Sequence, residues 1–413
     1  MNSVEKKKNE IDNKKKDPSI ELLRIIGCFS VIGTHIKWQI KKKKKFINFS
    51  IIFNGCLCAD GVAIFWYIMG FFFFKKISYK KRLNILFKKI CVPVIITSFF
   101  YFYFSKFNFN KIEIKSYLLK KTKYDYLNLF YNILIFNESS HLWFCYVYIL
   151  IVILYPSFEG FNNYFEINKI NSYKIFLLFL SIAIENDFFD NKVMGIEHHG
   201  FNGVLGAIPF IFCGNELKKN INKFKNKKIF SIFIIFFIGI NYLRSKIIFI
   251  TKRIIFIKWY SSFGIINGFF LFIFAYSLND ILHNKILYFL ITKISSFTYY
   301  IYLIHPFVID NVFRKYKLDK KLTKNYHSIK ALIFYQTIST ILVFINSLFI
   351  SIFLSFLIKI FCKIINYINK LFFEKEKMKN IYYKKNYLLL FDKKIEIEIL
   401  NKNYYYIILL NIC

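Results

Sequence analysis

The sequence predicts an all-α membrane protein, a polytopic bundle of about ten transmembrane helices. Of its 413 residues, 56% are hydrophobic and 21% are aromatic. The mean hydropathy of +0.39 is also high for a soluble chain. The apolar residues gather in runs close to the roughly 20 residues that a helix needs to cross a bilayer. These observations exclude a water-soluble enzyme.

Ten apolar runs are the candidate spans, of which the fifth and seventh are the shortest. In chain order they are Ser19–Ile40, Gly55–Phe74, Ile85–Phe104, His141–Phe158, Tyr173–Asn186, Gly200–Glu216, Ile229–Leu243, Trp259–Leu278, Ile294–Asn311 and Ala331–Ile358. They divide the chain into a basic N-terminal segment (1–18), a transmembrane domain (19–358) and a basic C-terminal tail (359–413), with no second domain expected.

The first span has a readable start. Asp17 can cap the free amides of a helix while Pro18 occupies its first turn, where a missing N–H costs nothing. The lysine-rich segment before it resembles the start of a signal peptide, but the apolar run that follows is long and shows no small-residue cleavage site. We expect this helix to remain as an anchor. In the second span, Gly61 and Gly70 are expected to allow close helix contact.

The charge and the cysteines do not identify a partner or a metal. A net charge of +36 could suggest nucleic acid, but Lys and Arg lie in short clusters between apolar runs, as loop residues do. The loops on the two sides carry similar numbers of them, and only the basic tail favours cytoplasmic termini in a multi-pass plasma-membrane protein. The eight cysteines mostly lie inside apolar runs, which indicates buried small residues and no metal site.

Ionisable residues inside apolar runs usually face a protein interior or an aqueous cavity. Arg24 and His35 are eleven residues apart in the first span, which is about three helical turns, so both share one face about 16 Å apart. An imidazole can take a proton from a hydroxyl, and a guanidinium at the helix mouth can hold an anionic donor such as a phosphate. The alternative is an Arg that reaches the interface and an interfacial His.

Three further spans carry polar candidates. Asp60 is expected either to pair with an intramembrane cation or to orient a histidine. His141 opens the fourth span, and His305 precedes Pro306, which interrupts the helical hydrogen-bond ladder. With the N-terminus inside, His35, His141 and His305 all fall in the outer half of the membrane, so we predict that they cluster. Each of them alone is equally consistent with a hydrogen-bonded structural residue.

Four segments resemble those of one family. Residues 20–24 (IELLR), ten further residues and His35 are similar to its first-helix signature of Arg or Lys, ten residues and His. Residues 61–70 (GVAIFWYIMG), 141–144 (HLWF) and 296–306 (SFTYYIYLIHP) are similar to three more of its segments, in the family order. On these motifs the chain, over residues 19–311, resembles the acyltransferase-3 family of integral-membrane acyltransferases.

The resemblance implies ten helices with cytoplasmic termini and transfer of an acyl group other than an amino-acyl group. The expected donor is acyl-CoA, commonly acetyl-CoA, and the expected acceptor is a hydroxyl of an envelope glycan or a lipid-linked sugar. It implies that His35 is catalytic and that Arg24 assists with the donor or with charge. Two positions depart from the family pattern, since Trp66 replaces a Phe and Met69 replaces the usual Ser.

The physical interpretation agrees with that chemistry. A cytoplasmic donor would meet Arg24 and the basic stretch 75–89, where Lys75 and Arg82 are expected to screen the phosphates of CoA. A positive-inside loop on anionic lipid is the alternative for this stretch. His35 would act as general base in a cavity closed to bulk water. Substrate contacts are expected from Asp60, His141 and His305.

Two other classes of function remain open. A transporter or flippase of lipid-linked saccharide would use intramembrane Arg, Asp and His as a substrate pathway. It predicts paired broken helices in two related halves, and the sequence shows no such repeat. A non-catalytic scaffold would use the polar residues only to hold helices together. Replacement of His35 by alanine would then leave every activity intact.

Overall fold

The computed structural model describes residues 16–41, 49–104, 140–170, 172–188, 201–221, 229–251, 261–310 and 336–360, together with a few isolated positions. Every regular element within these ranges is helical, and none of the described residues forms a strand. The chain divides into two units, residues 1–355 and 356–413. The predicted all-α class is therefore confirmed for the described part of the chain.

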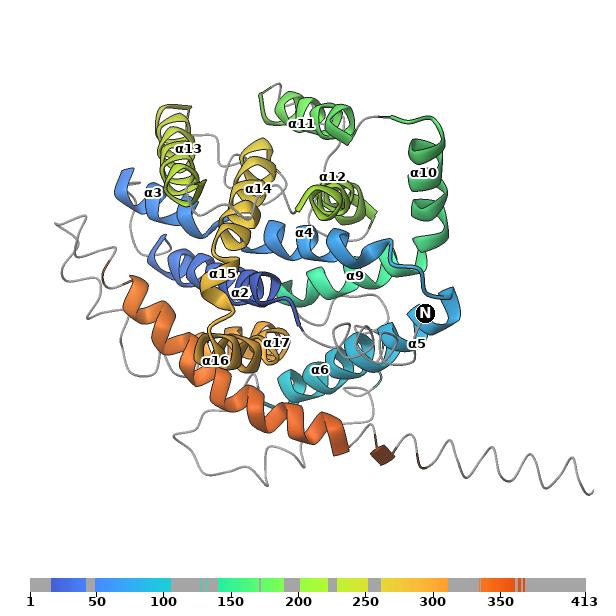
Figure 1. The fold of residues 1–413 in the computed structure, drawn as a ribbon. Coiled ribbons are helices and arrows are strands. Elements are labelled where there is room, and N and C mark those ends of the chain that lie inside the picture. The colour runs from blue at the N-terminus through green and yellow to red at the C-terminus, as the bar shows by residue number, and fades with distance from the viewer. Residues whose placement is uncertain are drawn as a thin grey trace, which may run out of the picture. The chain divides into compact units, whose positions relative to one another are not determined.

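The helices of the first unit are labelled in Figure 1. The longer ones are α2 (Pro18–Lys41), α3 (Phe49–Cys58), α4 (Gly61–Phe73), α5 (Tyr79–Leu86), α6 (Val92–Phe104), α9 (Trp143–Ile153), α10 (Tyr155–Ile167), α11 (Ser172–Phe188), α12 (Phe201–Asn220), α13 (Ile229–Thr251), α14 (Ser262–Ser277), α16 (Lys285–Ser295) and α17 (Thr298–Val308). Shorter pieces are α15 (Asn279–Leu282), a 3₁₀ turn at Ser140–Leu142 and a π-helical turn at Phe87–Cys91 that joins α5 to α6.

Five helical segments among the described residues are long and apolar enough to cross a membrane. They are Pro18–Ile36, Ile52–Phe73, Tyr79–Phe102, Ile232–Thr251 and Gln336–Ile360. Two bent pairs, α9 with α10 at 64° and α16 with α17 at 57°, raise the number to seven if each pair counts as one span. The ten expected spans are not all confirmed. The fifth, sixth and eighth exist as α11, α12 and α14, but none of them passes the same test by itself.

One predicted boundary was wrong. The seventh run was expected to end at Leu243, but α13 continues to Thr251. Arg244, which was assigned to a loop, is therefore inside a helix. The second run holds two helices, α3 and α4, with a break at Ala59 and Asp60. Together they form one candidate span, Ile52–Phe73.

The start of α2 and the packing of α4 were predicted correctly. The carboxylate of Asp17 accepts from the backbone N–H of Ser19 at 2.9 Å. A Cβ at Gly61 would lie 2.6 Å from the carbonyl oxygen of Gly27 in α2, and one at Gly70 would lie 2.2 Å from that of Ile211 in α12. Glycine at these positions lets α4 pack directly against the backbones of α2 and α12.

Candidate active site

A cavity of about 480 Å³ lies against α2, α4, α5, α9 and α17. Most of its lining is apolar. Among the described residues, the cationic side chains that line it are Arg24, Lys75, Arg82 and Lys89. Tyr302 and Thr298 line it from α17. The structure thus brings together all three residues predicted to bind the donor.

Arg24 is held in place by a carboxylate of its own helix. Its Nη1 lies 2.8 Å from Oε1 of Glu21, three residues earlier. Glu21 is itself buried, and it also accepts a hydrogen bond from the hydroxyl of Ser295. The Arg24 side chain remains 33% exposed, so the guanidinium is positioned but still accessible from the cavity.

Arg82 is fixed more tightly, with only 8% of its surface exposed. Its guanidinium lies over the ring of Tyr155, 3.6 Å from the centroid, and donates to the carbonyl oxygen of Lys75 at 3.0 Å. Its buried Nε has no hydrogen-bond partner among the described residues. A buried donor without a partner is costly unless a ligand supplies one, so Arg82 is prepared to meet an anion.

The three histidines from distant parts of the chain lie together, as predicted. The ring of His35 in α2 is 5.0 Å from that of His305 in α17, and the ring of His141 is 6.2 Å from that of His305. Tyr101 of α6 stacks beside His141 at 4.8 Å. His305 is completely buried, whereas His35 and His141 are partly accessible.

Tyr302 connects the cavity to the histidines. Its ring lines the cavity and lies 5.8 Å from the ring of His305. Its hydroxyl donates to the backbone carbonyl of His141. His35 does not itself line the cavity. The histidine cluster therefore lies immediately behind Tyr302. Arg24 and His35, which were expected to share one face of the first helix, do not line the same cavity.

The comparison with known families agrees with this geometry. The family described as "acyltransferase domain" matches residues 17–360, most of the chain. The chain belongs to the acyltransferase-3 family. It is accordingly a membrane acyltransferase. The comparisons with curated proteins and with solved structures returned no match.

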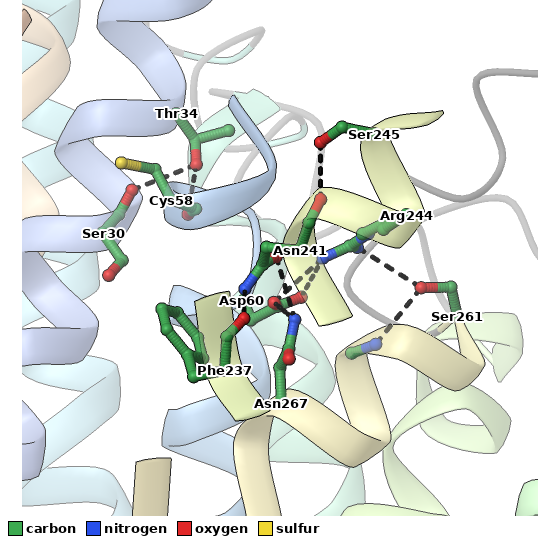
Figure 2. A network of polar contacts seen from close by, with 11 residues as sticks. Ser30, Thr34, Cys58, Asp60, Phe237, Asn241, Arg244, Ser245, Ser261 and Asn267 are labelled. Carbon is green, nitrogen blue, oxygen red and sulfur yellow. Dashed lines mark hydrogen bonds and ion pairs between the residues drawn. The ribbon is translucent and has the colours of Figure 1, made fainter. Parts of the chain in front are cut away.

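In this acyltransferase Asp60 lies apart from the candidate site. Figure 2 shows its carboxylate between Arg244 of α13 and Asn267 of α14. The Arg244 Nη1 is 3.0 and 2.9 Å from the two carboxylate oxygens, and Asn267 Nδ2 is 2.8 Å from Oδ2. Asp60 is not among the residues that line the cavity. Of the predicted roles of Asp60, pairing with an intramembrane cation agrees with this geometry. Orienting a histidine and contacting the substrate have no support from it.

Sequence reasoning missed Arg244, Tyr101 and Tyr302. Arg244 had a signal, because apolar residues resume after Lys246 and an intramembrane Asp60 needs a cation. Tyr101 and Tyr302 had none, since tyrosine is abundant in this chain, with 30 residues. For metals, the described residues contain no group of three His, Cys, Asp or Glu side chains placed to hold an ion.

Proposed function

We propose that this acyltransferase binds acyl-CoA in the basic cavity and transfers the acyl group to a hydroxyl, with His35 as general base. The observation that carries the proposal is the position of Tyr302. Tyr302 lines a cavity that four cationic side chains also line, and the same residue contacts His141 and His305. The cavity proposed to bind the donor and the histidines proposed to handle the proton are thus adjacent.

The cationic side chains suit the phosphates of CoA. Arg24 and Arg82 present planar guanidinium groups, which bind phosphate oxygens in pairs, and Lys75 and Lys89 add point charges. The apolar part of the lining suits the pantetheine arm and the acyl group, since ligand pockets combine an apolar wall with few polar contacts. We propose acetyl as the acyl group, on the family resemblance.

The chemistry needs a base close to the acceptor hydroxyl. His35 would take the hydroxyl proton while the oxygen attacks the thioester carbonyl carbon, forming the O–acyl bond as the C–S bond breaks. The proton then passes to the departing CoA thiolate. His141 remains a candidate for contact with the acceptor, which we propose to be an envelope glycan or a lipid-linked sugar.

The family also supports a membrane arrangement beyond the spans described above. We propose ten spans, in which α11, α12 and α14 supply the three that fall short alone and each bent pair crosses once. Both termini would then be cytoplasmic, in the plasma membrane. Arg24, near the start of α2, would face the cytoplasmic pool of acyl-CoA in this orientation.

The test is transfer of labelled acetyl from acetyl-CoA to extracted envelope glycan and lipid-linked sugar by the purified full chain. We expect His35→Ala to reduce labelling to a small residual rate and Arg24→Ala to raise the KM for acetyl-CoA. Matched controls are His283→Ala and Lys285→Ala, which alter exposed residues outside the cavity. Equal labelling by the wild type and both site variants would overturn the proposal.

A further inference from the structure

The backbone of α17 is opened at His305. Pro306 has no N–H, so the carbonyl of Tyr302, four residues earlier, lacks its usual helical donor. The ring of His305 forms a hydrogen bond with this carbonyl instead, with Nδ1 2.7 Å from the Tyr302 oxygen. Pro306 and His305 thus act together, because the proline leaves the Tyr302 carbonyl without a backbone donor and the histidine ring supplies a side-chain donor.

This contact fixes which nitrogen of His305 carries the proton. A backbone carbonyl can only accept a hydrogen bond, so Nδ1 must be the donor, and a neutral imidazole then has a bare lone pair on Nε2. The Nε2 atom is buried and has no hydrogen-bond partner among the described residues. His305 therefore offers an unused acceptor inside the protein.

The neighbours of His305 indicate which group could donate a hydrogen bond to its Nε2 atom. Nε2 of His141 already contacts the carbonyl of Leu303 at 3.3 Å, and the hydroxyl of Tyr302 already donates to His141. His35 is the nearest of these rings, at 5.0 Å. Within the described part of the chain, no hydrogen bond is formed by either nitrogen of His35.

We propose that His305 is a positioning residue that accepts a hydrogen bond from His35 and stabilises it as an imidazolium. The inference rests on the proposed role of His35 as base. Neutral His35 carries one N–H toward His305 and keeps its other nitrogen bare for the acceptor hydroxyl. When it takes the hydroxyl proton, it becomes a cation with two N–H groups, one still directed at His305 Nε2. His305 itself gains and loses no proton.

This arrangement does the work that a carboxylate does behind the histidine of a Ser-His-Asp triad, which is to orient the base and favour its charged form. A neutral imidazole suits an apolar membrane interior, since a buried carboxylate carries a large desolvation cost. Hydrogen bonds of this kind are often long without substrate and tighten when the substrate binds. The ring centroids of His35 and His305 lie 5.0 Å apart.

The test compares His305→Leu with His305→Gln in the same acetyl-transfer assay. Gln keeps an amide oxygen that can accept from His35, and Leu keeps only the bulk. We expect Leu to lower kcat by about 10- to 100-fold, as loss of an outer partner of a catalytic group does elsewhere. The KM for acetyl-CoA should not change, and Gln should restore much of kcat. Equal losses in both variants, or none, would overturn the inference.

A double variant separates a positioning role from general damage. If His305 acts through His35, then adding His305→Leu to His35→Ala should lower the residual rate no further. A further loss would instead overturn the inference. The two proposals fail differently: full activity of His35→Ala removes the general base, whereas full activity of His305→Leu with an inactive His35→Ala removes only the partner.

Discussion

The hydroxyl of Tyr302 donates to the backbone carbonyl of His141, and this bond ties α17 to the 3₁₀ turn before α9. Both residues were placed in separate spans by the sequence. The bond therefore joins a residue that lines the basic cavity to the backbone of one of the clustered histidines.

Removal of that hydroxyl tests the connection. Tyr302→Phe keeps the ring that lines the cavity and loses the bond to His141, and a buried hydrogen bond contributes about 1 kcal/mol. We expect kcat for acetyl transfer to fall about tenfold with little change in the KM for acetyl-CoA. Steady-state kinetics would measure it, with Tyr242→Phe on the exposed side of α13 as control. An unchanged kcat would show that the bond has no part in turnover.

Variants of Arg82 should show whether donor binding depends on its charge alone or also on its planar shape. Its guanidinium lies over the ring of Tyr155, 3.6 Å from the centroid, and a lysine keeps the charge but not the planar group. We expect Arg82→Lys to raise the KM for acetyl-CoA about tenfold, which corresponds to about 1.4 kcal/mol, and Arg82→Met to raise it more. Lys80→Met, on the same helix but outside the cavity lining, should leave KM unchanged. If all three variants bind the donor alike, Arg82 is a structural residue.

Pro306 should matter for turnover rather than for stability. Pro306→Ala restores an N–H that can pair with the Tyr302 carbonyl and displace the ring of His305. We expect kcat to fall about tenfold while the unfolding midpoint stays the same or rises, since a proline inside a helix is unfavourable. Pro209→Ala, which alters the interior proline of α12, is the matched control. A Pro306→Ala enzyme with normal kcat would contradict a role in turnover for the bond between His305 and the Tyr302 carbonyl.

The Asp60–Arg244 pair should stabilise the fold. Asp60→Asn and Arg244→Met each leave one buried charge without its partner, which typically costs about 3–5 kcal/mol. The double variant removes both charges, and we expect it to be more stable than either single variant. Thermal unfolding in detergent would measure the three, with Lys246→Met, an exposed neighbour, as control. Additive losses in the double variant would argue against a coupled pair.

The helix contacts of α4 give a steric prediction. A Cβ at Gly70 would lie 2.2 Å from a backbone oxygen of α12, and neither backbone can move without shifting its helix. We expect Gly70→Ala to destabilise the protein by about 1–3 kcal/mol. Gly239→Ala, which meets no atom within 4 Å, should be neutral or slightly stabilising. Similar unfolding midpoints for the two variants would contradict the packing of α4 on α12.

The parts of the site that follow from helix geometry could be predicted from the sequence. The spacing of Arg24 and His35 depends only on the rise of one helix, and the depth of His141 and His305 follows from the order of the spans. Lys75 and Arg82 lie in a short basic stretch next to a span, so their position near Arg24 follows from the connection. Asp17 acts within the first turn of its own helix.

The remaining features depend on contacts between distant residues. The partner of Asp60 lies 184 positions away. The apolar residues after Lys246 indicate that the helix continues past Arg244, but they do not show that Arg244 reaches Asp60. The hydroxyl of Tyr101 accepts from the N–H of Phe307 and donates to the carbonyl of Leu303. That insertion requires α6 and α17 to lie side by side, which hydropathy does not specify. Ten spans are not all confirmed, because composition alone does not separate a short buried helix from a complete crossing.

The π-helical turn at Phe87–Cys91 sets how far Tyr101 is rotated about the helix axis relative to Arg82. One continuous helical rod carries Arg82 before this turn and Tyr101 after it, about 28 Å apart at 1.5 Å per residue. A π turn contains one residue more than an α turn needs. Loss of a single residue there would rotate everything downstream by about 100°, so Tyr101 would leave α17 while Arg82 stayed beside Tyr155.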